Sequence, residues 1–281
     1  MSEWGRLSPV QQAWALEHLG TAEVVRDMSW NLVESIVLHV RTSAGDVVVK
    51  AGDANNHHIA RELSAHPRHT GPLVASGHAA RLRAADADLR VMILDHLPGQ
   101  LLEGTDAEQQ PAAYEQAGAL LRRLHEQETR EDAEYWTRTI ARALSWLDKP
   151  NRLDAEASAE ARRILLSSCL TSAAVVPTHG DWQPRNWLID GDVVRVIDFG
   201  RFGFRPAATD LTRLAAKQWR NRPDLESAFF AGYGNDPRER NHWRLERLQE
   251  AVGTACWAFA VGDVEFEAQG HRMLAEILSE F

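Results

Sequence analysis

The sequence predicts an α+β protein of two lobes, a β-rich lobe over residues 1–97 and a mainly helical lobe over residues 98–281. Short apolar runs that alternate with polar residues, a pattern typical of strands, are concentrated in the first part. Apolar residues at helical spacing dominate the second part, which also carries one hairpin signal. With 281 residues, the chain is long enough for one large domain or for two lobes.

The first lobe is expected to hold two helices and a five-stranded antiparallel sheet. Ser8 and Pro9 mark the start of the helix, because serine caps helix N-termini and proline suits the first turn; Gly20 marks its end. A second helix, over residues 55–66, is stopped by Pro67. The expected strands are 23–28, 32–41, 47–50, 73–77 and 89–94, with residues 84–88 as a loop between the last two.

The second lobe is expected to consist mostly of helices. Thr105 and Glu108 form a capping-box pattern for a long helix that ends near residue 130. Asp190-Gly191 lies between two apolar runs and is a strong signal for a two-residue hairpin. The other expected helices cover 131–147, 154–170, the region from Asp210 to Trp219, and most of 223–281.

Charge and cysteine content restrict the partners and the compartment. The formal net charge of −9 argues against nucleic acid and is compatible with a cationic substrate. Two cysteines, Cys169 and Cys256, do not make a disulfide framework. No signal-peptide-like segment follows Met1 and no apolar run reaches 18 residues, so we expect a cytoplasmic protein without a membrane span.

The most informative stretch is His179-Gly180-Asp181-Trp182-Gln183-Pro184-Arg185-Asn186, which is followed by Asp198-Phe199-Gly200. Apolar runs flank both pieces, and the predicted hairpin lies between them. Asp181 and Asn186 are therefore expected at the two ends of a short loop. Asp198 is expected at the end of the next strand, close enough to Asn186 to share a site with it.

This arrangement suits phosphoryl transfer. Magnesium prefers hard oxygen ligands and is usually held by one or two carboxylates together with substrate phosphates. Asn186 and Asp198 supply two such oxygens, which leaves Asp181 to face an attacking hydroxyl group. A positioned base beside a metal–phosphate clamp is the template for this chemistry. Any one of these residues alone could be an ordinary surface residue, but the combination is specific.

These residues resemble the catalytic loop and metal-binding motif of the protein kinase-like fold, in the version carried by aminoglycoside phosphotransferases. That version opens with His-Gly-Asp, as His179-Gly180-Asp181 does here. The resemblance implies a protein kinase-like two-lobed fold with ATP and Mg²⁺ as cofactors. It also implies Asp181 as the catalytic residue and Asn186 and Asp198 as the metal ligands.

The resemblance also points to residues of the first lobe. Ser29 and Asn31 lie in the turn that covers the ATP phosphates in this fold, although an ordinary hairpin turn is the alternative. Lys50, one of three lysines, ends a strand and is the candidate to pair with the phosphates. Glu62 is its expected ion-pair partner. Asp53 is a rival partner, and Glu62 could instead be exposed.

The segment that begins at Leu94 matches the expected hinge between the lobes. In the resembling fold, backbone groups of this hinge bind adenine. The Asp95 carbonyl and the Leu97 amide are the candidates for those hydrogen bonds, with Leu94 beside the adenine ring. Pro98 has no N–H group and cannot replace Leu97 as the donor.

The sequence therefore predicts an ATP-dependent O-phosphotransferase. The substrate expected is a cationic antibiotic, either an aminoglycoside or a basic cyclic peptide such as capreomycin or viomycin, and the outcome is resistance. Asp210 comes only twelve positions after Asp198, which favours a small molecule over a polypeptide substrate. A kinase for an amino alcohol, a sugar or a homoserine-like metabolite is one alternative. A nucleotide-binding pseudoenzyme is another.

Overall fold

The computed structural model describes residues 4–30 and 35–281. The chain divides into two compact units. Unit 1 comprises Met1–Gln127, His179–Gly203 and Pro223–Gly234; unit 2 comprises Glu128–Thr178, Phe204–Arg222 and Asn235–Phe281. All the candidate site residues belong to unit 1, and the lobe boundary near residue 97 stays a prediction.

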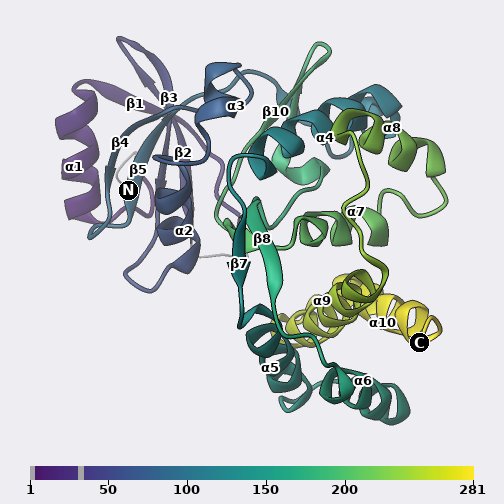
Figure 1. Ribbon diagram of the computed structural model, residues 1–281. Helices are drawn as coiled ribbons and strands as arrows, with labels where there is room; N and C mark the ends of the chain where they lie inside the picture. Colours follow the sequence, from purple (N-terminus) through teal and green to yellow (C-terminus); the bar gives the residue numbers. More distant parts are fainter. Residues whose placement is uncertain (1–3, 31–34) are drawn as a thin grey trace. The chain divides into compact units, whose positions relative to one another are not determined.

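Unit 1 contains a five-stranded sheet in the order β1-β2-β3-β5-β4 (Figure 1). All four neighbouring pairs are antiparallel, as the sequence predicted. The strands are β1 (Ala22–Asp27), β2 (Ile36–Thr42), β3 (Gly45–Ala51), β4 (Leu82–Asp86) and β5 (Val91–Asp95). The sequence placed the start of the second strand at residue 32, which lies outside the described residues; the described strand begins at Ile36.

Helix α1 (Pro9–Leu19) packs on this sheet through an apolar cluster with β2, β3 and β5. Its capping box is present: the Gln11 amide donates to Ser8 Oγ at 3.3 Å, and Ser8 N donates to Gln11 Oε1 at 3.1 Å. Gln11 Nε2 also donates to the carbonyls of Gly52 and Leu89, each at 2.8 Å. One side chain thus caps the helix and ties it to the sheet.

The prediction of a strand over 73–77 is wrong, because this segment forms helix α3 (Gly71–Ala75). Pro72 sits in its first turn, where proline suits a helix, and a short apolar run carries no clear period. The fourth strand is instead β4, which takes up part of the loop predicted over 84–88. Its residues alternate between partly and fully exposed, a weak pattern that hid the strand.

Two predicted helices of unit 1 are shorter than expected. Helix α2 (His57–Ala65) begins after Asn56, whose side chain accepts from the Ile59 amide at 3.0 Å. The long helix predicted from Thr105 is divided into the 3₁₀ turn η1 (Asp106–Gln109) and helix α4 (Pro111–His125). The predicted capping box is absent, because Glu108 accepts from the Gly104 amide.

The predicted hairpin is confirmed as β9 (Trp187–Asp190) and β10 (Val193–Val196), with β6 (Gln100–Leu101) on the other side of β9. Helix α8 (Pro223–Tyr233) packs against α4 at very short range. A Cβ atom on Gly118 would lie 2.1 Å from the Phe229 carbonyl oxygen, and one on Gly232 would lie 1.8 Å from the Glu115 carbonyl oxygen. Both positions therefore require glycine.

Unit 2 is mainly helical and has a small sheet in the order β11-β8-β7. Its largest apolar cluster joins α5, α6, α9 and α10 around Trp136. In the part of the chain that the structure describes, no helix combines the length and apolar character needed to cross a membrane. The elements are β7 (Arg130–Asp132), α5 (Tyr135–Leu147), α6 (Ala155–Ser167), β8 (Ala173–Thr178), β11 (Gly203–Arg205), η3 (Ala207–Leu211), α7 (Thr212–Ala216), α9 (Arg240–Val261) and α10 (Val264–Leu278).

Candidate active site

The loop from His179 to Asn186 is shaped by its first two residues. The buried His179 contacts the Ile197 carbonyl through Nε2 at 3.0 Å, and its Nδ1 accepts from the Asp181 amide at 3.2 Å. These partners place the ring proton on Nε2. Gly180 has a φ of 80°, a conformation that glycine adopts at little cost. The His-Gly pair therefore fixes the backbone that presents Asp181.

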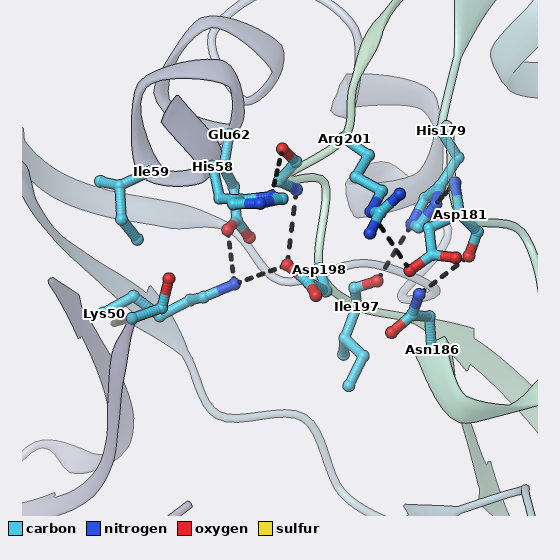
Figure 2. Close-up of polar contacts among 12 residues, drawn as sticks. Lys50, His58, Ile59, Glu62, His179, Asp181, Asn186, Ile197, Asp198 and Arg201 are labelled. Atoms are coloured by element: carbon cyan, nitrogen blue, oxygen red, sulfur yellow. Dashed lines mark hydrogen bonds and ion pairs between the residues drawn. The ribbon is translucent and has the colours of Figure 1, made fainter. Parts of the chain in front are cut away.

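Asp181 is 5% exposed, and both of its carboxylate oxygens have partners. Gln183 Nε2 donates to Oδ1, and Arg185 Nη2 donates to Oδ2 at 2.6 Å. Arg201 Nε lies 3.9 Å from the same Oδ2 (Figure 2). No role was predicted from the sequence for these three partners. Their proximity in sequence to Asp181 and to Asp198-Phe199-Gly200 is the signal that could have identified them.

Asp198 follows β10 and has a φ of 65°, in the left-handed region that non-glycine residues rarely occupy. Its Oδ1 accepts from Lys50 Nζ at 3.1 Å and from the Gly200 amide at 3.4 Å. The side chain is 49% exposed. Backbone strain of this kind is often stored at functional sites. Here it turns a half-exposed carboxylate toward Lys50.

Lys50, on β3, lies between two carboxylates (Figure 2). Its Nζ donates to Glu62 Oε2, which forms the predicted ion pair, and also to Asp198 Oδ1. Burial alone would lower the pKa of Lys50, but the charges of Asp198 and Glu62 outweigh it and raise that pKa. The rival partner Asp53 instead accepts from the Asn55 amide at 2.9 Å. The ammonium group therefore stays charged although it is buried.

Glu62, on α2, is 1% exposed. Burial alone would raise its pKa, but Lys50 and the neighbouring His66 lower the pKa to about 2. His66 Nε2 lies 3.6 Å from Glu62 Oε1, one helical turn further along α2. His58, also on α2, contacts the Gly200 carbonyl at 3.1 Å. Helix α2 thus holds Lys50 through Glu62 and also reaches the Asp198-Phe199-Gly200 segment.

Asn186 and Asp198 fit a magnesium ion by their chemistry. Asn186 Nδ2 donates to the Asp181 carbonyl at 2.8 Å, so its oxygen is the end left for a ligand (Figure 2). Asp198 offers Oδ2, since Oδ1 already meets Lys50. Among the described residues, no group of three or more His, Cys, Asp or Glu side chains could hold a metal. Two protein oxygens suit magnesium, which takes its remaining ligands from water and phosphates.

Of the remaining predicted residues that the structure describes, Leu94 lies in β5, and Ser29 and Leu97 follow strands of the sheet. Ser29 Oγ accepts from the Val37 amide at 2.9 Å, and Ser29 N donates to Asp27 Oδ1 at 2.8 Å, so Ser29 is tied to its own turn. Asn31 lies outside the described residues. Leu94 is buried on β5, and Leu97 follows that strand and is partly exposed.

Asp95 ends β5, and its carboxylate is paired with Arg81 at 3.2 Å and with Arg83. Its backbone amide donates to the Arg81 carbonyl at 2.9 Å. These contacts fix the backbone at the predicted adenine-binding position. The hydrogen bond from the Asp95 carbonyl to adenine stays a prediction.

Solved structures with the same fold include several phosphotransferases. A thermostable mutant of aminoglycoside phosphotransferase APH(4)-Ia, in a ternary complex with ADP and hygromycin B, superposes with a TM-score of 0.70 at 14% identity, covering 97% of this chain and 98% of that one. Macrolide 2'-phosphotransferase MphH from Brachybacterium faecium has a TM-score of 0.61 at 16% identity, covering 94% and 97%. Choline kinase LicA from Streptococcus pneumoniae has a TM-score of 0.65 at 12% identity, covering 96% and 97%.

These structures establish the protein kinase-like fold. A search of curated proteins found no match. The family model described as the phosphotransferase enzyme family matches residues 37–243, which is more than half of the chain and includes Lys50, Asp181 and Asp198. The chain therefore belongs to the phosphotransferase enzyme family.

Proposed function

We propose that this chain transfers the γ-phosphate of ATP to a hydroxyl group of a cationic antibiotic. The observation that carries the proposal is the contact of Lys50 with both Glu62 and Asp198, in the same unit as Asp181 and Asn186. A charged, buried lysine beside a half-exposed carboxylate is suited to a phosphate group and its metal ion.

Each residue then has a separate task. Lys50 binds ATP phosphates, and Glu62 keeps its ammonium group charged and in place. Asn186 and Asp198 would hold Mg²⁺, which when bound neutralises part of the phosphate charge. Asp181 orients the acceptor hydroxyl and takes its proton. A loose transition state needs positioning more than a strong base, and a carboxylate already held by two donors suits that need.

The nucleotide is proposed to lie against the five-stranded sheet. The Asp95 carbonyl and the Leu97 amide bind adenine, and Leu94 packs beside the ring. Ser29 stabilises the turn over the phosphates, where Asn31 is proposed to supply a further donor. ADP in the related APH(4)-Ia structure supports a nucleotide as the cofactor.

A cationic substrate is supported by the net charge of −9 and by the aminoglycoside phosphotransferase among the similar structures. Aminoglycosides and basic cyclic peptides of the capreomycin and viomycin type are the classes we propose, and the outcome is antibiotic resistance. The two free cysteines support a cytoplasmic location. The choline kinase structure favours a second candidate, a kinase for a small amino alcohol.

A coupled ADP-release assay tests the proposal. The acceptors are aminoglycosides, basic cyclic peptides, a macrolide and amino alcohols, each with magnesium and ATP. The proposal expects acceptor-dependent ADP release with one of the two cationic antibiotic classes. Release with choline or another amino alcohol alone would replace it with the second candidate. ATP binding without acceptor-dependent release from any compound would indicate a pseudoenzyme and contradict the proposal.

A further inference from the structure

Arg185 contacts the carboxylate that is proposed to face the acceptor. It lies four residues after Asp181 and directly before Asn186, in the 3₁₀ turn η2 (Pro184–Asn186). Its Nη2 donates to Asp181 Oδ2 at 2.6 Å. The guanidinium of Arg185 therefore lies beside Asp181, and Arg185 is next in sequence to Asn186, a proposed metal ligand.

The other neighbour of Arg185 comes from the turn after β1. Its guanidinium carbon lies 5.3 Å from the centre of the Trp30 ring, and that ring is 56% exposed. This turn is the one proposed to cover the ATP phosphates. Arg185 thus joins the phosphate-covering turn to the catalytic loop, with an aromatic face on one side and a carboxylate on the other.

The loop does not depend on Arg185 for its shape. Asn186 bonds the Asp181 carbonyl, His179 bonds the Asp181 amide, and Gln183 holds Oδ1. Within the described residues, Arg185 makes one hydrogen bond, although a guanidinium has five N–H donors in a planar fork. Its side chain is 27% exposed, so a ligand can reach the unused donors.

We propose that Arg185 is a further catalytic residue that binds the phosphoryl group being transferred. This inference rests on the proposed function. A guanidinium fork matches the geometry of phosphate oxygens, which carry more charge than the carboxylate it now contacts. When the γ-phosphate enters, Arg185 turns part of its donor fork from Asp181 to the phosphate oxygens. Asp181 Oδ2 then becomes accessible to the acceptor hydroxyl.

The reaction balances with Arg185 unchanged. The acceptor oxygen forms a bond to the γ-phosphorus, and the bond from that phosphorus to the β,γ-bridging oxygen breaks and leaves ADP. The hydroxyl proton passes to Asp181. Arg185 remains protonated throughout and stabilises charge on the phosphoryl oxygens, as arginines do in other phosphoryl transfers.

The test compares binding of AMP-PNP, which has a γ-phosphate group, with binding of ADP, which has none. Both are titrated with magnesium into the wild type, Arg185→Met and Arg185→Lys. The matched control is Arg122→Met, which breaks another i,i+4 arginine–carboxylate pair, with Glu126, on the exposed face of α4. Thermal unfolding of each variant checks that it is folded.

Arg185→Met should weaken AMP-PNP binding by about 10- to 100-fold, as loss of charge-assisted hydrogen bonds does, with ADP affinity changed by less than about threefold. Arg185→Lys should recover part of the loss, since lysine keeps the charge without the fork. Asp181→Asn should instead tighten AMP-PNP relative to ADP, because it removes the competitor for Arg185. Trp30→Leu should weaken AMP-PNP less than Arg185→Met does.

An unchanged ratio of AMP-PNP to ADP affinity in Arg185→Met would overturn the inference, even if turnover fell. That result would show that Arg185 only positions Asp181. Failure of the proposed function looks different, because the wild type itself would then release no ADP with any acceptor. The two ideas can thus fail separately.

Discussion

Two buried glutamates, one in each unit, have pKa values shifted in opposite directions. Glu62 in unit 1 is 1% exposed and Glu246 in unit 2 is 0% exposed. The pKa of Glu62 is lowered to about 2, while the pKa of Glu246 is raised to about 7. Burial acts in the same direction on both, so the difference comes from their neighbours.

Glu246 has hydrogen bonds from neutral side chains, and the positive charge of Arg142 only partly offsets the effect of burial on its pKa. Tyr135 Oη donates to its Oε1 at 2.7 Å, and Gln249 Nε2 donates to its Oε2 at 3.0 Å. Burial dominates these neutral donors and raises the pKa. Glu62 has Lys50 against it and stays ionised. We infer that unit 1 retains buried charge because the site uses it, whereas Glu246 is a packing group that carries a proton near neutral pH.

The largest effect is expected from Asp198→Ala, which removes the carboxylate that contacts Lys50. Loss of a carboxylate that would hold the charge-neutralising Mg²⁺ should lower turnover by at least about 10³-fold. ADP release measured across a magnesium titration checks this. Turnover that keeps the wild-type magnesium dependence would remove Asp198 from the metal site and weaken the contrast between the units.

Asp181→Asn keeps the shape of the side chain and removes its charge and its capacity to take a proton. Turnover should fall by about 10²- to 10⁴-fold, the usual cost of losing a general base. Steady-state ADP release with saturating ATP and acceptor measures it. A rate within about tenfold of wild type would mean that another carboxylate faces the acceptor hydroxyl.

Glu246 should make stability depend on pH between 4.5 and about 7. Its pKa is higher in the folded protein, so the unfolded chain releases this proton first as pH rises. Below pH 4.5, Glu246 is protonated in both states and does not lower the free energy of unfolding. As pH rises from 4.5 to about 7, the free energy of unfolding falls, and the total loss above pH 7 is about 3 kcal/mol.

Glu246→Gln should remove this decline, because an amide does not ionise. Urea unfolding of both proteins at pH 5 and pH 8 gives the comparison. The dependence of the unfolding free energy on urea concentration should be the same for the two proteins. An equal decline in the variant and the wild type would show that Glu246 stays ionised in the folded state. In that case the contrast with Glu62 would not hold.

The smallest of these effects is expected from Glu62→Gln, which acts on the nucleotide only through Lys50. The KM for ATP should rise or the turnover fall by about 10- to 100-fold, as for other residues that orient a group in contact with a ligand. Glu246→Gln is the matched control and should leave both constants within about twofold of wild type. If Glu62→Gln and Glu246→Gln changed activity equally, the two glutamates would not differ in function.

The sequence predicted the parts of unit 1 that depend on local pattern. The hairpin β9-β10 and the loop before it follow from turn residues and short apolar runs, whereas the pairing of Lys50 with Glu62 was implied by the family resemblance; all three are present. Residues 73–77 were predicted wrongly because three apolar residues fit a helix as well as a strand. Local periodicity could not decide between them.

Contacts between segments that are far apart in the chain could not be predicted from the sequence. Glu246 and Tyr135 are 111 residues apart in the chain, and nothing in either segment signals the hydrogen bond between them. Trp30 and Arg185 meet across an even longer separation. The pKa of a buried group depends on such contacts. Its chemical state could therefore be inferred only after the fold was known.

The most direct test of phosphoryl transfer is the identity of the product. Wild type and Asp198→Ala would be incubated with ATP, magnesium and each acceptor that supports ADP release, and the acceptor analysed by mass spectrometry and ³¹P NMR. The account predicts one phosphate ester on an acceptor hydroxyl with the wild type and almost none with the variant. ADP and free phosphate with an unmodified acceptor, or equal product from both proteins, would contradict it.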